Sequence, residues 1–218
     1  MKTMAIVFTG DEFAEGAMAI RQALKKENVK ASFFLTGRFY RNKEFTEALK
    51  QLKKDGHYLG PHSNEHVLYA PWHKRDSLLV TEEIFANDIQ ANYAVMKKFG
   101  ISQKDAHYFL PPYEWYNDSI ATWAKRQGLQ LINYSPGTIS AADYTWPELK
   151  NYRSTATIIE SIKNYEAKYS KGLNGFILLL HIGTDPRRTD KLYEQLPQLL
   201  QWLKQKGYAL TSIDKLLQ

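Results

Sequence analysis

Short apolar runs alternate with stretches of helical spacing along almost the whole chain. The helical spacing is clear in Gly16–Asn28, where Ala17, Ile20, Ala23 and Leu24 fall on one face. Seven runs have the length and composition of strands: Met4–Phe8, Ala31–Leu35, His57–Leu59, His107–Leu110, Leu129–Asn133, Phe176–His181 and Tyr208–Leu210. This alternation predicts an α/β fold with a parallel sheet and right-handed crossovers.

Start and stop signals place further helices between these strands. They are predicted at Lys43–Asp55, at Thr81–Phe99 with Thr81 as N-cap, at Asn117–Gln127, at Ala156–Tyr169, at Thr189–Lys206 with a break near Pro197, and after Ser212 as the last N-cap. Residues 67–79 and 134–155 have the composition of irregular loops. Seven such units in 218 residues predict one domain, 1–218, and favour a barrel, complete or incomplete, over an open sheet. No G-x-G-x-x-G follows the first strand, which argues against a dinucleotide site.

Composition narrows the class of protein. The chain contains no cysteine, which excludes disulfides and thiolate metal sites. Its net charge of +6 comes from lysines that are spread along helix faces among acids, so we expect no nucleic-acid partner. The longest apolar run, Gly175–Ile182, is far shorter than a membrane span, so no span is predicted.

The N-terminus leaves the compartment open. Residues Met1–Thr9 lead directly into a strand pattern and show no signal peptide. The protein is therefore expected to be cytoplasmic, or periplasmic or secreted if a native N-terminal segment precedes this sequence. The oligomeric state does not follow from the sequence.

Polar and ionisable residues gather where the predicted strands end, which is where parallel barrels place their active sites. His62 and His66 are four residues apart, so both imidazoles would face one side if the segment turns helically. Asp11 follows another strand, and two histidines with one carboxylate form a metal site with an open position for water. His181 ends the strongest strand and is a candidate general acid or base.

Each of these residues also has an ordinary structural interpretation. Asp11 could cap a helix, and His181 could be a buried histidine with its hydrogen bonds satisfied. Their joint occurrence at strand ends favours the functional interpretation.

Four motifs, in order, give this chain a family resemblance. They are Val7–Glu12, which resembles a T-F-D-D segment; His62–His66, which matches H-[ST]-x-x-H; Phe109–Tyr113, which resembles R-P-P-Y; and Leu178–His181, which resembles L-x-H. Together they resemble the polysaccharide deacetylases of carbohydrate esterase family 4, the NodB-like domain, over residues 4–217. The H-[ST]-x-x-H match is the most specific of the four.

The resemblance implies a fold and a set of roles. The fold would be a distorted (β/α)7 barrel. Asp11, His62 and His66 would bind a divalent metal ion, most simply zinc, with cobalt or nickel as alternatives. His181 would protonate the leaving group, and the backbone N–H of Tyr113 would help to hold the oxyanion. The implied activity is metal-dependent hydrolysis of N- or O-linked acetyl groups on an acetylated carbohydrate.

Two positions depart from the family pattern. Gly10 stands where the family has its catalytic-base aspartate, and Leu110 stands where it has the arginine that pairs with that base. Losing both partners of a buried ion pair can be nearly neutral, whereas losing one is costly. Glu12 and Glu114 are candidate replacement bases. Each also has a purely structural interpretation. Glu12 could be an acid at a helix N-terminus, and Glu114 could be a loop acid that is hydrogen-bonded to backbone.

Aromatic residues in two loops offer surfaces for a sugar ring. Trp115 and Tyr116 follow the third motif, and Tyr144 and Trp146 lie in the irregular segment. Xylan, pectin, chitin fragments and peptidoglycan all remain open as substrates. Two other functions also remain: a carbohydrate-binding module without turnover on the same fold, and a hydrolase of non-carbohydrate amide bonds.

Overall fold

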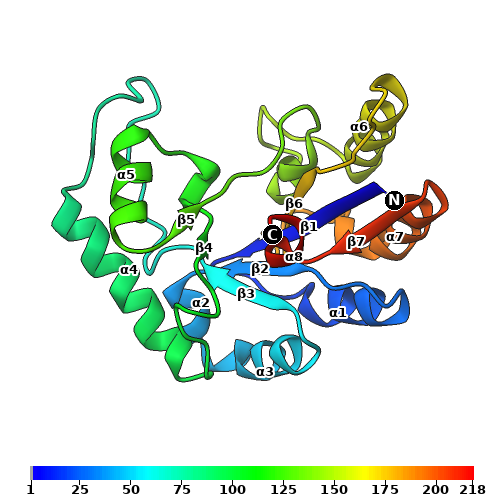
Figure 1. Cartoon of the computed structure of the whole chain (residues 1–218). Helices are drawn as coiled ribbons and strands as arrows, with labels where there is room; N and C mark the ends of the chain where they lie inside the picture. The colour runs from blue at the N-terminus through cyan, green and yellow to red at the C-terminus, as the bar shows by residue number, and fades with distance from the viewer. Residues whose placement is uncertain (1) are drawn as a thin grey trace. The chain divides into compact units, whose positions relative to one another are not determined.

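The computed structural model describes residues 2–218, in which strands and helices alternate (Figure 1). The strands are β1 (Lys2–Gly10), β2 (Ser32–Leu35), β3 (Tyr58–Pro61), β4 (Tyr108–Phe109), β5 (Gln130–Leu131), β6 (Ile177–His181) and β7 (Tyr208–Thr211). The α-helices are α1 (Ala17–Lys26), α2 (Gly37–Arg41), α3 (Thr46–Lys54), α4 (Glu82–Lys97), α5 (Asp118–Arg126), α6 (Thr155–Lys168), α7 (Leu196–Gln205) and α8 (Ile213–Leu216). Short 3₁₀ turns occupy Lys43–Phe45, Pro112–Glu114, Ser140–Tyr144 and Leu192–Gln195.

The strands form parallel sheets, as the alternation predicts. β3, β2, β1 and β6 follow one another in a sheet that β7 joins by pairing with β1. β1 pairs in parallel with β6, so that Thr9 lies opposite His181, and with β7, so that Lys2 lies opposite Tyr208. The predicted α/β fold is therefore confirmed.

The paired strands do not form one closed ring within residues 2–218. β4 and β5 make a separate parallel pair of two residues each. β4 ends at Phe109, and Pro111 and Pro112, which follow shortly after, have no N–H with which to extend a ladder. A single hydrogen bond, from the Leu110 amide to the Pro61 carbonyl at 3.4 Å, relates β4 to the end of β3. The barrel that the family resemblance implies is distorted in this respect.

By its internal packing the chain divides into two compact units. The first unit comprises residues up to 33, 51–58 and 134–218, and the second comprises 34–50 and 59–133. The predicted single domain, 1–218, stays a prediction, and each unit is described by itself.

The first unit is built on β1. Its residues from Met4 to Gly10 are all buried, and β6 contributes a second buried run at Ile177–Leu180. Helix α1 presents to this core the apolar face that the sequence predicts: Ala17, Ile20, Ala23 and Leu24. A continuous apolar strand is typical of a parallel sheet that is covered on both faces.

The second unit has its own apolar core. Helices α4 and α5 pack beside each other (Figure 1). Their buried faces meet strand and loop residues in one cluster: Tyr69, Phe85, Ile89, Phe109, Ile120, Ala124 and Leu129. Tyr69 belongs to the loop predicted at 67–79, so the fully buried ring of Tyr69 anchors this loop in the apolar core.

Several local predictions need correction. Helix α2 was not predicted from the sequence; the side chain of its N-cap Thr36 accepts a hydrogen bond from the Phe39 amide. The stretch 134–155 is not wholly irregular, because Ser140–Tyr144 forms a 3₁₀ turn. By contrast, the predicted interruption near Pro197 is confirmed. A 3₁₀ turn at Leu192–Gln195 precedes α7, and Pro197 lies in the first turn of α7, where proline is tolerated. Ser212 occupies the N-cap of α8, but its side chain makes no capping hydrogen bond.

Candidate active site

Backbone strain concentrates in two of the segments that the sequence identifies. Non-glycine residues with positive φ within residues 2–218 are Asn28, Ser63, His66, Tyr113 and Glu114. All but Asn28 fall in the His62–His66 segment or in the Pro111–Trp115 segment. Left-handed conformations cost a non-glycine residue about 1–2 kcal/mol each, and they persist where surrounding contacts enforce them, often at functional sites.

His62 and His66 lie together in the second unit. Their ring centroids are 5.1 Å apart. The sequence analysis assumed that a helical turn brings the two rings together, but the segment does not form one. Instead Ser63 and His66 adopt φ of 68° and 54°, and the Ser63 hydroxyl accepts a hydrogen bond from the His66 amide at 2.9 Å.

The fully buried His62 ring is oriented by backbone. Its Nδ1 lies 2.7 Å from the Leu110 carbonyl oxygen. A carbonyl only accepts, so Nδ1 carries the proton and Nε2 carries the lone pair that a metal would take. Because this contact uses the backbone of residue 110, it does not depend on whether an arginine or a leucine stands there.

The loop between the two histidines is anchored to α4. Both carboxylate oxygens of Asp88 accept backbone hydrogen bonds, from the Asn64 amide at 2.8 Å and from the Glu65 amide at 3.1 Å. Partial burial raises the pKa of Asp88, and these two hydrogen bonds act in the opposite direction. Asp88 therefore fixes the loop that carries both imidazoles, a role that the sequence analysis missed because the two segments are 24 residues apart.

The histidine pair fits one metal ion. Two imidazoles bound tetrahedrally to one zinc ion, with Zn–N bonds of about 2.1 Å, place their ring centroids about 5 Å apart. The observed separation of 5.1 Å agrees with this value. Within residues 2–218, however, no group of three or more His, Asp or Glu side chains gathers into a metal site. The third ligand proposed from sequence, Asp11, lies in the first unit, so its role stays a prediction.

In the first unit, Asp11 and Glu12 follow β1 in a bend. Asp11 is half-buried and Glu12 is exposed. The ordinary interpretations made from sequence do not hold for either residue. The N-cap of α1 is Gly16, and its first turn contains no acid, so Asp11 is not a helix cap and Glu12 is not a helix N-terminal acid.

His181 pairs with a carboxylate that the sequence analysis did not identify. Its Nδ1 lies 2.6 Å from Oδ1 of Asp143, and its backbone N–H donates to Oδ2 of the same side chain at 2.9 Å. Asp143 is buried, with 2% of its surface exposed. A buried carboxylate on Nδ1 fixes the orientation of the ring, which is the arrangement expected of a residue that transfers a proton. Asp143 lay in a stretch predicted to be irregular, so no pattern singled it out.

The segment that carries Asp143 is held in place by a buried arginine. Arg188 is fully buried and donates from Nη1 to the carbonyl oxygens of Thr145 at 2.6 Å and Arg153 at 3.1 Å. It also lies 3.6 Å from Oδ2 of Asp190. The loop after β6 and the segment around Asp143 are thereby fixed to each other within the first unit.

Tyr113 and Glu114 stand in the second unit beside the histidine pair. The Tyr113 ring packs against the His66 ring at 4.4 Å, and Tyr113 and Glu114 both have positive φ. The Glu114 amide donates to the Pro111 carbonyl at 3.0 Å, and its carbonyl accepts from Asn133 at 2.9 Å. This turn holds the backbone in the strained form that the Pro-Pro-Tyr motif encodes.

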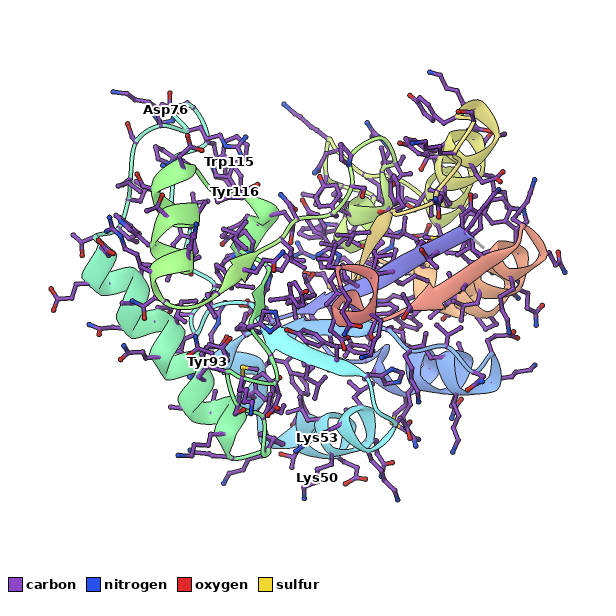
Figure 2. The ribbon with its side chains drawn as sticks, in the orientation of Figure 1. Lys50, Lys53, Asp76, Tyr93, Trp115 and Tyr116 are labelled. Atoms are coloured by element: carbon purple, nitrogen blue, oxygen red, sulfur yellow. The ribbon has the colours of Figure 1, made fainter. Side chains whose placement is uncertain are left out.

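The aromatic residues proposed to bind sugar lie in different surroundings. Trp115 and Tyr116 are half-buried, and Figure 2 shows them at the same end of the second unit as Asp76. In the first unit, Arg187 lies over the Trp146 ring at 3.9 Å and pairs with Asp185, which lowers the pKa of that carboxyl to about 2. Tyr144 is 43% exposed, and its ring centroid lies 5.2 Å from that of His181, so it stands beside the candidate acid.

Comparison with known proteins gives one family. A model described as polysaccharide deacetylase matches residues 2–132. The chain is 28% identical over 217 residues to a peptidoglycan-N-acetylglucosamine deacetylase of Bacillus cereus, covering 99% of this chain and 88% of that protein. It is 27% identical to the uncharacterized protein YlxY of Bacillus subtilis, covering 95% of this chain but only 54% of the relative, about half its length.

A solved structure shows the same fold. A carbohydrate esterase family 4 pseudoenzyme from Bacillus anthracis matches with a TM-score of 0.76 and 20% identity, covering 100% of this chain and 66% of that chain. A mutant of that protein, described as having restored enzymatic activity, matches equally well at 0.76 and 21% identity.

The histidine loop generates a first prediction. Replacing His66 with alanine should abolish tight zinc binding, because one of two imidazole donors is lost. Asp88→Ala should weaken zinc binding by about tenfold, since supports outside the ligand set typically contribute this much. Affinity is measured by competition with a chromophoric chelator. Gln90→Ala, an exposed change two residues further along α4, serves as the control and should bind zinc as the unaltered chain does. Unchanged zinc affinity in His66→Ala would show that the ligand assignment is wrong.

Proposed function

The chain belongs to the polysaccharide deacetylase family, and from this premise we propose that it is a metal-dependent hydrolase that removes acetyl groups from an acetylated carbohydrate. The observation that carries the proposal is the combination of the His62–His66 pair at 5.1 Å with the buried Asp143 bonded to His181. The histidine pair would provide metal donors, and the His181–Asp143 pair would provide an oriented acid. The Bacillus cereus relative is a peptidoglycan-N-acetylglucosamine deacetylase, which makes an N-acetylated polymer the first substrate to test.

Deacetylases of this family depend on a metal ion. We propose that His62, His66 and Asp11 bind it here, and that zinc is the ion, with cobalt or nickel as substitutes. Two imidazoles and one carboxylate are donors that suit zinc and leave a position open. When bound, such an ion polarises the acetyl carbonyl and lowers the pKa of a water molecule.

The residues of the chain would divide the remaining work. The backbone N–H of Tyr113 would donate to the oxygen of the acetyl group as negative charge develops on it. His181 would transfer a proton from its ring to the departing amine or alcohol, while Asp143 holds Nδ1 and stabilises the protonated ring. Trp115, Tyr116 and Trp146 would supply apolar surface to the sugar.

The general base is the open part of this proposal. Gly10 has no side chain to accept a proton, and Leu110 cannot pair with a carboxylate. Among the two candidates, Glu114 is favoured over Glu12. Glu114 is half-buried and follows Tyr113, whose ring packs on His66, whereas Glu12 is exposed.

The same two positions favour a second candidate function. Without the family's aspartate and arginine, the protein would bind acetylated carbohydrate without hydrolysing it. A structural neighbour is a pseudoenzyme of this fold, which shows that the fold is compatible with loss of turnover. A hydrolase of non-carbohydrate amides, the other alternative from sequence, has no observation in its favour.

Release of acetate tests the function directly. We expect the chain, supplied with zinc or cobalt, to release acetate from N-acetylglucosamine oligomers and from acetylated xylan at measurable but unequal rates. His66→Ala should abolish release, because a metal donor is lost. Acetate is quantified enzymatically after removal of the protein. Binding of these oligomers without acetate release under either metal would favour the binding-module function.

The His181–Asp143 pair gives a separate prediction. His181→Ala should retain zinc and lower kcat on an N-acetyl substrate by about 10²–10⁴-fold, the usual range for a proton-transfer group. Asp143→Asn should lower kcat less and leave KM nearly unchanged, because it disturbs the orientation of His181 and not substrate binding. The pH–rate profile distinguishes this role from a structural one, since only a positioning residue moves the alkaline limb. An unchanged kcat in His181→Ala would exclude the acid role.

Two glutamine variants identify the base. Glu114→Gln should lose most of kcat together with the acidic limb of the pH–rate profile, while Glu12→Gln should keep both. Glu83→Gln, an exposed acid on α4, is the matched control. Restoring the family pair with Gly10→Asp and Leu110→Arg together should make the rate independent of Glu114. If both Glu114→Gln and Glu12→Gln retain the full rate and limb, neither residue is the base.

A further inference from the structure

An exposed tryptophan lies one ring away from the histidine pair. Trp72 belongs to the loop predicted at 67–79 and has 57% of its surface exposed, the highest fraction among the large hydrophobic side chains of the described residues. Its ring centroid lies 5.5 Å from that of Tyr113, which in turn lies 4.4 Å from that of His66. Leaving a tryptophan in water is costly, and an exposed ring that adjoins other rings is typical of a binding surface.

The surface continues beyond Trp72. The Trp115 ring lies 5.6 Å from the Trp72 ring, and the Arg75 guanidinium lies over Trp115 at 4.5 Å and over Tyr116 at 5.3 Å. We define the subsite surface as Trp72, Arg75, Trp115 and Tyr116. Together with Tyr113, it forms a continuous row of rings that leads away from His66, and all of these residues belong to the second unit.

This row is rigidly supported. Nδ2 of the buried Asn117 donates to the carbonyl oxygens of Arg75 at 2.9 Å and Ser77 at 3.0 Å, and the Leu79 amide donates to the Tyr69 carbonyl at 2.9 Å. The loop therefore does not have to be ordered when a ligand binds, which favours affinity. Figure 2 shows the loop, labelled at Asp76, projecting beside Trp115 and Tyr116.

Arg75 gives the surface a chemical preference. Its Nε donates to the Tyr116 carbonyl at 2.6 Å, and its guanidinium carbon lies over the rings of Trp115 and Tyr116. None of the ion pairs found within residues 2–218 includes Arg75, and the acid beside it in sequence, Asp76, forms none with it. An arginine held this way keeps its terminal nitrogens in a fixed fork, which matches a carboxylate. Exposed Lys74 adds positive charge next to it.

We propose that Trp72 and Arg75 form a subsite for a sugar residue that carries a carboxylate, adjacent to the sugar whose acetyl group lies at His62 and His66. This inference deepens the proposed function and rests on it. The ring of the acidic sugar stacks on Trp72, and its carboxylate receives charge-assisted hydrogen bonds from the terminal nitrogens of Arg75. The carboxylate is that of a uronic acid or of a lactyl ether on a muramic acid residue.

Calorimetric titration tests the subsite with two matched pairs of ligands. The first pair is a tetramer of N-acetylglucosamine and a tetramer in which N-acetylmuramic acid alternates with it. The second pair is xylotetraose with and without a glucuronic acid substituent. The full chain carries His181→Ala, so that the ligands are not consumed during the titration.

We expect at least one acidic ligand to bind about tenfold more tightly than its neutral partner, which corresponds to one charged hydrogen-bond pair. Arg75→Gln should remove this preference, and Trp72→Ala should weaken both members of the pair about tenfold. The pair that shows the preference identifies the source of the carboxylate. Tyr169→Ala and Arg126→Gln, an exposed ring and an exposed cation elsewhere, are the controls and should change neither affinity.

Two results would overturn the proposal. The first is equal affinity for acidic and neutral ligands in both pairs, and the second is unaltered affinity in Trp72→Ala. Thermal unfolding of each variant verifies that the fold is intact. Arg75→Lys tests the role of the paired terminal nitrogens of Arg75. It keeps the positive charge and should recover only part of the preference for the acidic ligand. Acetate release by the unaltered chain is measured separately. Its absence, with the binding preference intact, would refute hydrolysis while leaving the subsite in place.

Discussion

The parallel pairing of β1 with β6 is the constraint on which the first unit depends. β1 is buried from Met4 to Gly10 and pairs with β2, β6 and β7, so neighbouring strands lie along both of its sides. The register sets Thr9 opposite His181, which brings the carboxyl ends of the two strands to the same end of the sheet. The chemistry proposed for Asp11 and His181 follows from this arrangement, because parallel strands deliver their following loops to one side of the sheet.

Both histidine positions are held by acids from elsewhere in the chain. The Asp143 carboxylate contacts Nδ1 of His181 and accepts a hydrogen bond from its backbone amide. The Asp88 carboxylate accepts hydrogen bonds from two backbone amides of the loop between His62 and His66. Neither acid needs to touch a substrate. Each satisfies backbone donors that would otherwise be costly to bury, and in doing so it fixes a ring. Fixed side chains lose little freedom when they react, which is the physical basis of preorganisation.

The altered motifs leave the backbone of the site intact. Gly10 and Leu110 replace an aspartate and an arginine that are expected to pair, and a pair removed as a whole leaves no stranded charge. The Leu110 carbonyl still orients His62, and the strained turn at Tyr113 and Glu114 is still held by Pro111 and Asn133. Strain that persists around a changed side-chain pair indicates that the geometry of these turns is still required, whichever carboxylate serves as base.

The seven strands, most of the helices and the segments that carry the chemistry could be predicted from local sequence. Local signals are enough for these: apolar period, glycine stops and an N-cap such as Thr81, whose side chain accepts from the Ile84 amide. The H-[ST]-x-x-H motif identified His62 and His66, but its helical explanation was wrong. Left-handed backbone at Ser63 and His66 cannot be read from a spacing, because non-glycine residues adopt it only when distant contacts enforce it. Asp88, Asp143 and Trp72 likewise became visible only in the tertiary structure. Their partners lie 23 to 43 residues away along the chain, and chain folding alone brings such residues into contact.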